Sequence, residues 1–500
     1  MNKRLTLEEL KSYLWNSAVI LRSNVEASAY KQYIFPLLFF KRICDVYDEE
    51  TAKAVEEYGS DAAEFEESDL HTFIVPKGYH WSDVRNCAEN VGKAITDAFH
   101  KVEMANSEKL QGVFGDGSWT NKNRLPDRLL KDLMEHFSSQ TLSIANCPED
   151  ELGNGYEYLI KQFADDSGHT AQEFYTNRTV VHLMTEMLKP QSGESIYDPT
   201  CGTAGMLISA IAYLKAHDKE WRNVAIYGQE IVTLSSAIAR MNLFLHGIKD
   251  FTIVNGNTLE NPAFIQNGKL RQFDLVLANP PYSISQWNRE AFASDKYGRN
   301  FLGVPPQGRA DYAFFQHILK SLKPDTGRCA ILFPHGVLFR NEEHDMREKL
   351  VKLDLLECII GLGANLFYNS PMEACIVICR TSKPRERRGQ VLFINAVNEV
   401  TRKNAQSFLE EQHIRKIADA YENFASDDCF SRTVTIQEIQ ANNFSLSIPL
   451  YVKEPTVSSE QADERTLQEV FQAWLEASSQ MHRCYEELNA MIQKGGQDNE

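Results

Sequence analysis

The hydrophobic and polar positions of the chain form two patterns, one helical and one mixed. Over residues 5–150 the apolar positions recur every three or four residues, as on the buried face of a helix. The stretch 30–47 is typical and carries Pro36 as an expected kink, while Pro126 is placed to open a helix over 127–136. In the remainder, short apolar runs alternate with amphipathic stretches, which predicts an open α/β sheet.

One apolar run in the second part ends in polar and rigid residues. Residues 273–278 suit a strand that is buried on both faces. Pro280 and Pro281 follow, so Asn279 is expected at the carboxyl end of the strand, where open α/β sheets bind ligands. The Asn279 side-chain oxygen and the Pro280 carbonyl could accept both N–H bonds of an exocyclic amino group, while Tyr282 stacks on the ring. The alternative interpretation is a strand that ends in a proline turn with a half-buried tyrosine.

An earlier strand leads into a turn of small residues. Residues 195–207 predict a strand, the turn and the start of a helix, with Asp198 at the mouth of the turn. Its carboxylate would repel a diphosphate and attract an ammonium group, which favours S-adenosylmethionine over a dinucleotide. The turn residues expected to contact this cofactor are Gly202, Thr203, Ala204 and Gly205.

The next two predicted strands also end in polar groups. Glu230 follows the run that starts at residue 225, and its carboxylate can accept hydrogen bonds from both ribose hydroxyls. Asn257 follows the strand at 251–254 and could bond the adenine amino group of the cofactor. Each residue alone could be an ordinary loop acid or amide. Successive strands that all end in suitable groups favour a nucleoside site.

Two loops flank these strands. Phe174 and Tyr175 lie side by side before a predicted helix, which packing alone could explain, although their position beside the turn favours a role in binding. Residues 283–309 form a polar loop far longer than the usual length of about 4 to 6 residues. Its basic residues would suit a nucleic-acid backbone or a solvated surface; they are Arg289, Lys296, Arg299 and Arg309.

The carboxyl-terminal part carries two further patterns. Strands at 374–380 and 391–394 are expected to form an antiparallel hairpin at the sheet edge, and the basic segment 382–388 between them is interpreted as an edge turn rather than a DNA contact. Over 467–492 the apolar residues alternate spacings of four and three, as in a heptad seam. Such a helix could fold back on its own domain, but the Trp and Tyr on the seam favour docking to another subunit.

Composition and charge narrow the functional class. The 500 residues carry a formal charge of −17, whereas proteins that bind duplex DNA alone usually present a positive face. A nucleic-acid substrate would therefore require another subunit for much of its binding. No apolar run approaches the roughly 18 residues of a membrane span, and the start lacks a secretory segment, so a cytoplasmic location is expected. The ten cysteines lack paired spacing, which predicts reduced thiols and no metal site.

Short motifs in a fixed order carry a resemblance to a known family. They are 24–48, 155–159, 173–176, 198–199 with 202–205, Glu230, 279–282, 337–340 and 365–368. On these residues the chain resembles the modification (methyltransferase) subunits, HsdM, of type I restriction-modification systems, within the adenine-N6 methyltransferases. One departure is Thr176-Asn177-Arg178 where the family usually has Thr-Pro-Arg, which predicts a less rigid loop.

This resemblance implies a fold, an activity and a set of partners. The expected domains are an all-α domain over 1–150, a Rossmann-like S-adenosylmethionine-dependent DNA methyltransferase domain over 151–455 and a docking helix over 456–500. The implied reaction is methyl transfer to N6 of a flipped adenine in duplex DNA, with Asn279, Pro280, Pro281 and Tyr282 as catalytic residues. Cofactor contacts are implied for Glu173, Phe174, Tyr175, Thr176, Asn177 and Arg178, beside Asp198, the turn, Glu230 and Asn257. The implied partners are a specificity subunit (HsdS-like), a restriction/translocase subunit (HsdR-like) and a second copy of the chain.

Two alternatives stay open at this stage. Asn-Pro-Pro-Tyr also occurs in enzymes that methylate a protein glutamine or a guanine amino group in RNA, although those lack the helical amino-terminal domain. A non-catalytic scaffold subunit is the other alternative, and the intact Asp198, Glu230 and Asn279 argue against it.

Overall fold

The computed structural model describes residues 4–59, 67–166, 176–366, 373–403, 406–427 and 429–453, together with 471–472, 474–475, 478–479 and 481. The chain forms two compact units, Met1–Val452 and Lys453–Glu500. Among the described residues, no helix is long and apolar enough to cross a membrane.

The first unit begins with helices that pack around one apolar core. Helix α1 (Leu7–Leu21) starts at a capping box, in which the Thr6 hydroxyl accepts from the Glu9 N–H and the Glu9 carboxylate accepts from the Thr6 N–H. Helix α2 (Lys31–Tyr58) continues through Pro36 and buries the apolar positions expected from its periodicity. The other helices of this region are η1 (Ala27–Ala29), α3 (Glu67–Leu70), α4 (Trp81–Arg85), α5 (Val91–Ala105), α6 (Ser107–Leu110), α7 (Asp127–Ser138) and α8 (Glu149–Asp166).

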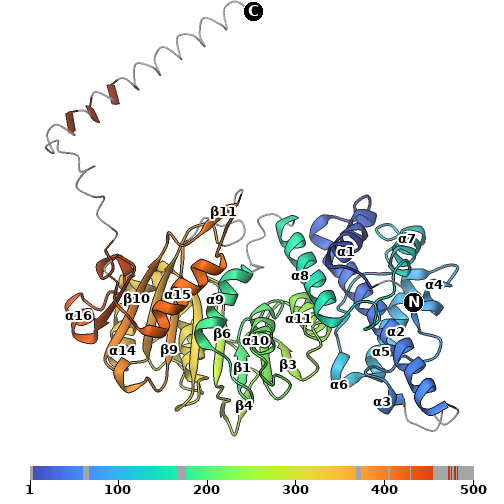
Figure 1. Cartoon of the computed structure of the whole chain (residues 1–500), viewed down its shortest axis with the longest axis horizontal. Coiled ribbons are helices and arrows are strands. Elements are labelled where there is room, and N and C mark those ends of the chain that lie inside the picture. The colour runs from blue at the N-terminus through green and yellow to red at the C-terminus, as the bar shows by residue number, and fades with distance from the viewer. Residues whose placement is uncertain are drawn as a thin grey trace, which may run out of the picture. The chain divides into compact units, whose positions relative to one another are not determined.

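A nine-stranded sheet follows, in the order β13-β10-β8-β9-β7-β6-β1-β2-β3 (Figure 1). Neighbouring strands pair in parallel, except that β9 is antiparallel to β7 and β8, and β13 is antiparallel to β10. The strands are β1 (Ser195–Asp198), β2 (Ala225–Glu230), β3 (Phe251–Asn255), β6 (Leu275–Ala278), β7 (Arg328–Pro334), β8 (Leu356–Leu362), β9 (Ala374–Arg380), β10 (Gln390–Ala396) and β13 (Ser431–Thr435). Two small ribbons lie outside this sheet, β4 (Ile265–Gln266) with β5 (Lys269–Leu270), and β11 (Thr401–Lys403) with β12 (Gln406–Phe408).

Helices cover both faces of the sheet, which confirms the predicted α/β fold. Helices α9 (Arg178–Leu188), α10 (Gly205–Ala216) and α15 (Glu411–Asn423) share an apolar core with one face. The opposite face packs against α13 (Asp311–Lys320), α14 (His344–Lys352) and α16 (Ile436–Ala441). Shorter helices lie at α12 (Arg289–Ala293), η3 (His335–Leu338), η4 (Asn341–Glu343), η5 (Arg385–Arg387) and η6 (Ile448–Leu450).

Helix α11 (Thr233–Leu245) joins the amino-terminal helices to the sheet. Its Met241 lies in the core of those helices, whereas its Leu243 lies in the core on the sheet. Phe244 of the same helix stacks on Phe39 of α2, with ring centroids 5.9 Å apart. The helical region and the sheet are therefore packed against a common element.

The strand order reverses beside β1. The chain proceeds from β1 to β2 and β3 on one side and from β6 to β7 on the other. Open α/β sheets bind ligands at the carboxyl ends of their strands beside such a reversal. Here those ends carry Asp198, Glu230 and Asn279.

The predicted hairpin of residues 374–380 and 391–394 is wrong. Strand β9 lies inside the sheet between β7 and β8, and β10 lies on the far side of β8. The segment 382–388 is therefore no edge turn, and its Lys383 is buried and donates to the carboxylate of Asp354 at 2.6 Å. Both strands are apolar along their length, so their pattern gave no sign that an earlier strand would separate them.

Apart from Lys453, the described residues of the second unit are helical. The rings of Phe471 and Trp474 stack with their centroids 6.0 Å apart, and both side chains are exposed. They belong to the helix expected over 467–492, of which Leu467, Tyr485, Leu488 and Ile492 lie outside the described residues. Docking of this helix to another subunit stays a prediction.

Replacement of Phe39 by alanine tests the packing around α11. Phe39 is 1% exposed and its ring contacts Phe73, Phe114 and Phe244. The cavity left behind should lower the free energy of unfolding by about 3–5 kcal/mol, measured by chemical denaturation. Val55→Ala on the same helix is the control, because Val55 is 56% exposed and should cost less than about 0.5 kcal/mol. Equal losses in the two variants would contradict the shared core.

Candidate active site

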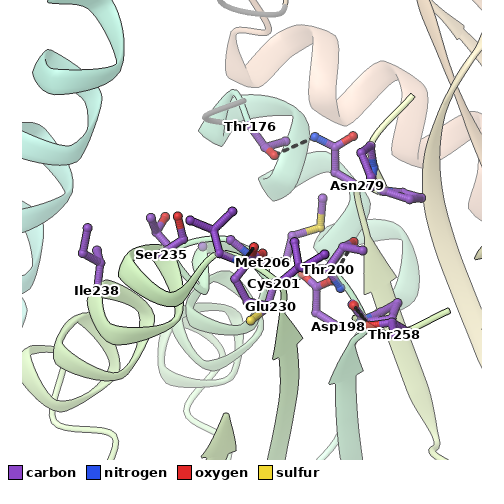
Figure 2. Close-up of a pocket in the computed structure, with 18 of the residues that line it drawn as sticks. Thr176, Asp198, Thr200, Cys201, Met206, Glu230, Ser235, Ile238, Thr258 and Asn279 are labelled. Carbon is purple, nitrogen blue, oxygen red and sulfur yellow. Dashed lines mark hydrogen bonds between the residues drawn. The ribbon is translucent and has the colours of Figure 1, made fainter. Parts of the chain in front are cut away.

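A cavity of about 330 Å³ opens at the carboxyl ends of β1, β2 and β6 (Figure 2). This volume lies within the range of small-molecule sites. Asn177 and Ala204 do not line the cavity, and Glu173, Phe174 and Tyr175 lie outside the described residues. The other predicted site residues all line it: Thr176, Arg178, Asp198, Gly202, Thr203, Gly205, Glu230, Asn257, Asn279, Pro280, Pro281 and Tyr282.

Two buried carboxyl groups face the cavity from adjacent strands. Asp198 ends β1 and is 2% exposed, and its Oδ1 accepts a hydrogen bond from the Thr200 N–H at 3.0 Å. Glu230 ends β2, and its oxygens accept from the N–H groups of Gly202 at 2.9 Å and Val232 at 2.8 Å. Glu230 therefore ties the small-residue turn to the neighbouring strand.

The environment of these acids favours a positively charged or hydroxylated ligand. Burial raises the pKa of the Asp198 carboxyl to about 8, and repulsion from Glu230 adds to this shift, although the hydrogen bond from Thr200 opposes it. Burial also raises the pKa of the Glu230 carboxyl. A cation or a pair of hydroxyl donors beside these groups would stabilise their ionised forms. S-adenosylmethionine offers both, as an ammonium group and two ribose hydroxyls, so the residues present fit this cofactor.

Asn279 follows β6 and lies above Asp198 and Glu230 in the view of Figure 2. Its Nδ2 donates a hydrogen bond to Oγ1 of Thr176 at 2.9 Å. Its Oδ1 is buried and has no hydrogen-bond partner within the described part of the chain. Because a buried acceptor without a partner is costly, Oδ1 is the atom that the N–H of a ligand would satisfy.

The chain after Asn279 is fixed by α13. Ser283 has a left-handed backbone, with φ 51°, and its N–H donates to Oδ1 of Asp311 at 2.7 Å. Asp311 is buried and pairs with Arg340 at 2.6 Å. Burial raises the pKa of the Tyr282 phenol well above its ordinary value, so this hydroxyl stays neutral while the residue lines the cavity.

The turn after β1 is shaped around Arg178. A Cβ atom on Gly205 would lie 1.7 Å from Nη1 of Arg178, so only glycine leaves room for the guanidinium group. The Nε of Arg178 donates to Oε2 of Glu157 at 2.6 Å. The Nδ2 of Asn242 donates to Oε1 of Glu157 at 2.6 Å and to the Thr203 carbonyl at 2.8 Å. Glu157 on α8 therefore holds both the arginine and, through the asparagine, the turn.

The amino-terminal helices also contribute to the cavity. Phe35 and Lys31 of α2 line it, as do residues of α8, namely Ile160, Phe163 and Ala164. Burial lowers the pKa of the Lys31 ammonium group. Helical periodicity could not indicate these contacts, because residues that face a cavity and residues that face a core have the same spacing. Glu157 lies in a motif that carried the family resemblance, but no local spacing marked it as part of a site.

Two predicted cofactor contacts are engaged in local structure. Asn177 is the N-cap of α9, where its Oδ1 accepts from the Thr179 N–H at 3.0 Å and its Nδ2 donates to the Ser407 carbonyl at 3.1 Å. These bonds anchor the position that is usually proline in the family. Asn257 lines the cavity, and its Oδ1 accepts from the Leu259 N–H at 3.0 Å and from the Glu260 N–H at 3.4 Å, so local backbone groups already occupy this oxygen.

Part of the long loop over 283–309 is held by its own arginine. Arg299 is 2% exposed and pairs with Asp295 at 2.6 Å. Its guanidinium group also donates to the carbonyls of Thr258 at 3.0 Å and Leu259 at 2.8 Å. The prediction that Arg299 faces solvent or a nucleic-acid backbone is therefore wrong, because the residue anchors the loop beside the cavity.

Gly205→Ala tests the close approach of Arg178 to the turn. The added methyl group would displace the guanidinium group, so binding of S-adenosylmethionine should weaken about tenfold or more by isothermal titration calorimetry. Gly308→Ala is the matched control, because a Cβ there meets no atom within 4 Å and the backbone is not left-handed. An unchanged affinity in Gly205→Ala would show that the arginine can move without consequence for the site.

Comparison with known proteins agrees with the family resemblance seen in the sequence. The HsdM N-terminal domain model matches residues 10–137, and the N-6 DNA Methylase model matches residues 148–460. The MjaVIII methylase subunit of a type I restriction enzyme from Methanocaldococcus jannaschii is 31% identical, over 98% of this chain and 86% of that protein. The corresponding HindI subunit from Haemophilus influenzae is 32% identical, over 72% of this chain and 83% of that protein.

A solved structure shows the same fold. The type I restriction-modification methyltransferase subunit from Streptococcus thermophilus is 30% identical, with a TM-score of 0.80, over 90% of this chain and 100% of that chain. The N-6 DNA Methylase model alone covers more than half of the 500 residues. The chain therefore belongs to the N-6 DNA methylase family.

Proposed function

We propose that the protein is a site-specific, adenine-specific DNA methyltransferase that acts as the modification subunit of a type I restriction-modification complex. The observation that carries this proposal is the buried Oδ1 of Asn279, an acceptor without a partner among the described residues, in the same cavity as Asp198 and Glu230. Family membership supports DNA as the methyl acceptor and S-adenosylmethionine as the methyl donor. The methylase subunits among its relatives support the place in a larger enzyme.

The acidic half of the cavity would bind the cofactor. S-adenosylmethionine supplies a methyl group attached to a positively charged sulfur. Asp198 would hold the ammonium group of the cofactor, and Glu230 would accept hydrogen bonds from the ribose hydroxyls. For Asn257 Oδ1 to accept from the adenine amino group, that bond would have to replace the longer bond from the Glu260 N–H at 3.4 Å. Arg178 and Glu157 would keep the turn in place beneath it.

The amide half would activate the target base. Adenine N6 is a poor nucleophile, because its lone pair is delocalised into the ring. If Oδ1 of Asn279 and the carbonyl of Pro280 accept its two N–H bonds, the nitrogen would be drawn toward sp³ geometry. Its lone pair would then form the N–C bond as the bond between sulfur and the methyl group breaks, which leaves an uncharged thioether and releases one N6 proton. Tyr282 would stack on the base after it leaves the duplex. The chain needs no covalent nucleophile for this reaction.

The complex would supply what this acidic chain lacks. A net charge of −17 is unfavourable for duplex DNA, so a specificity subunit would read the target and provide much of the binding. The exposed Phe471 and Trp474 on the carboxyl-terminal helix suit docking to such a subunit. A second copy of this chain and a restriction/translocase subunit would complete the enzyme.

The proposed domains are 1–150, 151–455 and 456–500. The family matches over 10–137 and 148–460 support the first boundary. The common packing at α11 explains why the first two domains form one compact unit. A cytoplasmic location would agree with a DNA substrate.

A methyl-transfer assay tests the function and the division of roles. The full chain with its specificity subunit and tritiated S-adenosylmethionine should label N6 of adenine in unmethylated genomic DNA. Asn279→Ala should abolish transfer but leave cofactor affinity within about twofold, whereas Asp198→Ala should weaken the cofactor about tenfold or more. Label on protein or RNA but not on DNA would favour the alternative acceptors. Equal loss of cofactor binding in both variants would contradict the two halves of the site.

Proton release on cofactor binding tests the environment of Asp198. Its pKa of about 8 lies above the unfolded value, so the folded chain holds an extra proton between about pH 4 and 8, and this group's contribution to stability falls as the pH rises through that window. An ammonium ligand should expel the proton. At pH 6.5, where a free α-amino group is already protonated, calorimetry in buffers of different ionisation enthalpy should detect up to one proton released. Asp198→Asn should release less, and equal release would exclude Asp198 as its source.

A further inference from the structure

We propose that Thr176 is a positioning residue for methyl transfer, which holds the side-chain amide of Asn279 with its oxygen toward the target amino group. This inference rests on the proposed function, because it concerns how the amide meets the base. It differs from the role that the family resemblance implies for Thr176, which is contact with the cofactor.

The two side chains meet although they come from distant parts of the sequence. The Nδ2 of Asn279 donates to Oγ1 of Thr176 at 2.9 Å, across 103 positions of the chain. Figure 2 shows the two side chains pointing toward each other at the edge of the cavity, away from Asp198 and Glu230. Both residues line the cavity, so their hydrogen bond lies where the base would be held.

The threonine is held on an anchored segment. The next residue, Asn177, caps α9 and donates from Nδ2 to the Ser407 carbonyl at 3.1 Å. Thr179 adds a second link, because its Oγ1 accepts from the Leu409 N–H at 3.1 Å. The Thr176 hydroxyl is therefore presented by backbone that is tied to β12 and the residue after it.

The chemistry of an amide explains why this contact matters. An amide has a donor at one end and an acceptor at the other, and an exocyclic amino group needs the acceptor. When Oδ1 of Asn279 faces the base, Nδ2 points into the protein and needs an acceptor of its own. Thr176 supplies that acceptor, and Oδ1 is left buried and without a partner among the described residues. Without the hydroxyl, the productive orientation would bury an unpaired N–H, and the amide would turn away from it.

Thr176→Val removes the hydroxyl and keeps the shape of the side chain. With the full chain and its specificity subunit, kcat for DNA methylation should fall about 10- to 100-fold, as expected for one unmade buried hydrogen bond. The Kd for S-adenosylmethionine should stay within about twofold, because in the proposed division of roles the amide binds the base. Thr176→Ser restores a hydroxyl and should bring kcat back to within about threefold of the wild-type value.

Thr179→Val is the matched control for the local structure. The Thr179 hydroxyl bonds Oδ1 of Asn177 at 2.8 Å and the Leu409 N–H, but it makes no contact with Asn279. Its replacement removes one of the two links that hold the segment but leaves the Asn279 amide its acceptor on Thr176, so kcat should fall less than about threefold. An equal fall in both valine variants would show that Thr176 only stabilises the segment, and a fall in cofactor affinity with unchanged kcat would show that it binds the cofactor; either result overturns the inference. Failure of the wild-type complex to methylate adenine would overturn the proposed function itself, whereas wild-type kcat in Thr176→Val would overturn this inference alone.

Discussion

Burial of two carboxyl groups at one edge of the sheet is the constraint on which the site depends. Asp198 and Glu230 end neighbouring parallel strands, so the pairing of β1 with β2 brings them together. The protein accommodates Glu230 through the N–H groups of Gly202 and Val232, and this requirement sets the path of the turn. Burial still raises the pKa of the Asp198 carboxyl to about 8, so a cationic ligand beside it would stabilise its ionised form. The electrostatics that oppose the folded state without a ligand therefore favour the bound state.

The same turn makes the amino-terminal helices part of the site. Because Gly205 has no side chain, the Arg178 guanidinium group can lie against the start of α10, where Glu157 of α8 holds it. Glu157 reaches the other side of the turn through Asn242 of α11, the helix that packs both on the sheet and on the amino-terminal helices. A displacement of α8 would therefore shift Arg178 and the turn after β1. This coupling gives a physical reason for the helical region and the catalytic sheet to occur together in one compact unit.

The residues that the sequence could identify are those whose position follows from the end of a strand. Asp198, Glu230 and Asn279 each terminate a short apolar run, and parallel strands place such ends at one edge, so local pattern was sufficient. The prediction of a hairpin between 374–380 and 391–394 was wrong, because strand order depends on contacts between residues far apart in the chain. The prediction for Arg299 was wrong for a related reason. A basic residue in a polar loop is expected to be solvated, and the loop sequence does not show that distant carbonyls accept its hydrogen bonds. Lys31 and Phe35 reach the cavity, and Glu157 reaches Arg178, only because the amino-terminal helices pack beside the sheet. The spacing of residues along a helix does not predict such packing.

The need for an acceptor that carries no charge explains why an amide, rather than a third carboxylate, follows β6. A carboxylate at position 279 would accept hydrogen bonds from the base equally well, but it would share the cavity with Asp198 and Glu230. A third negative charge would raise the pKa of those groups further and favour their neutral forms, which attract a cation less. An amide avoids this repulsion, yet it brings an N–H that must also be satisfied when it is buried. The Thr176 hydroxyl accepts from this N–H, so an asparagine at position 279 creates the need for a hydroxyl group at position 176.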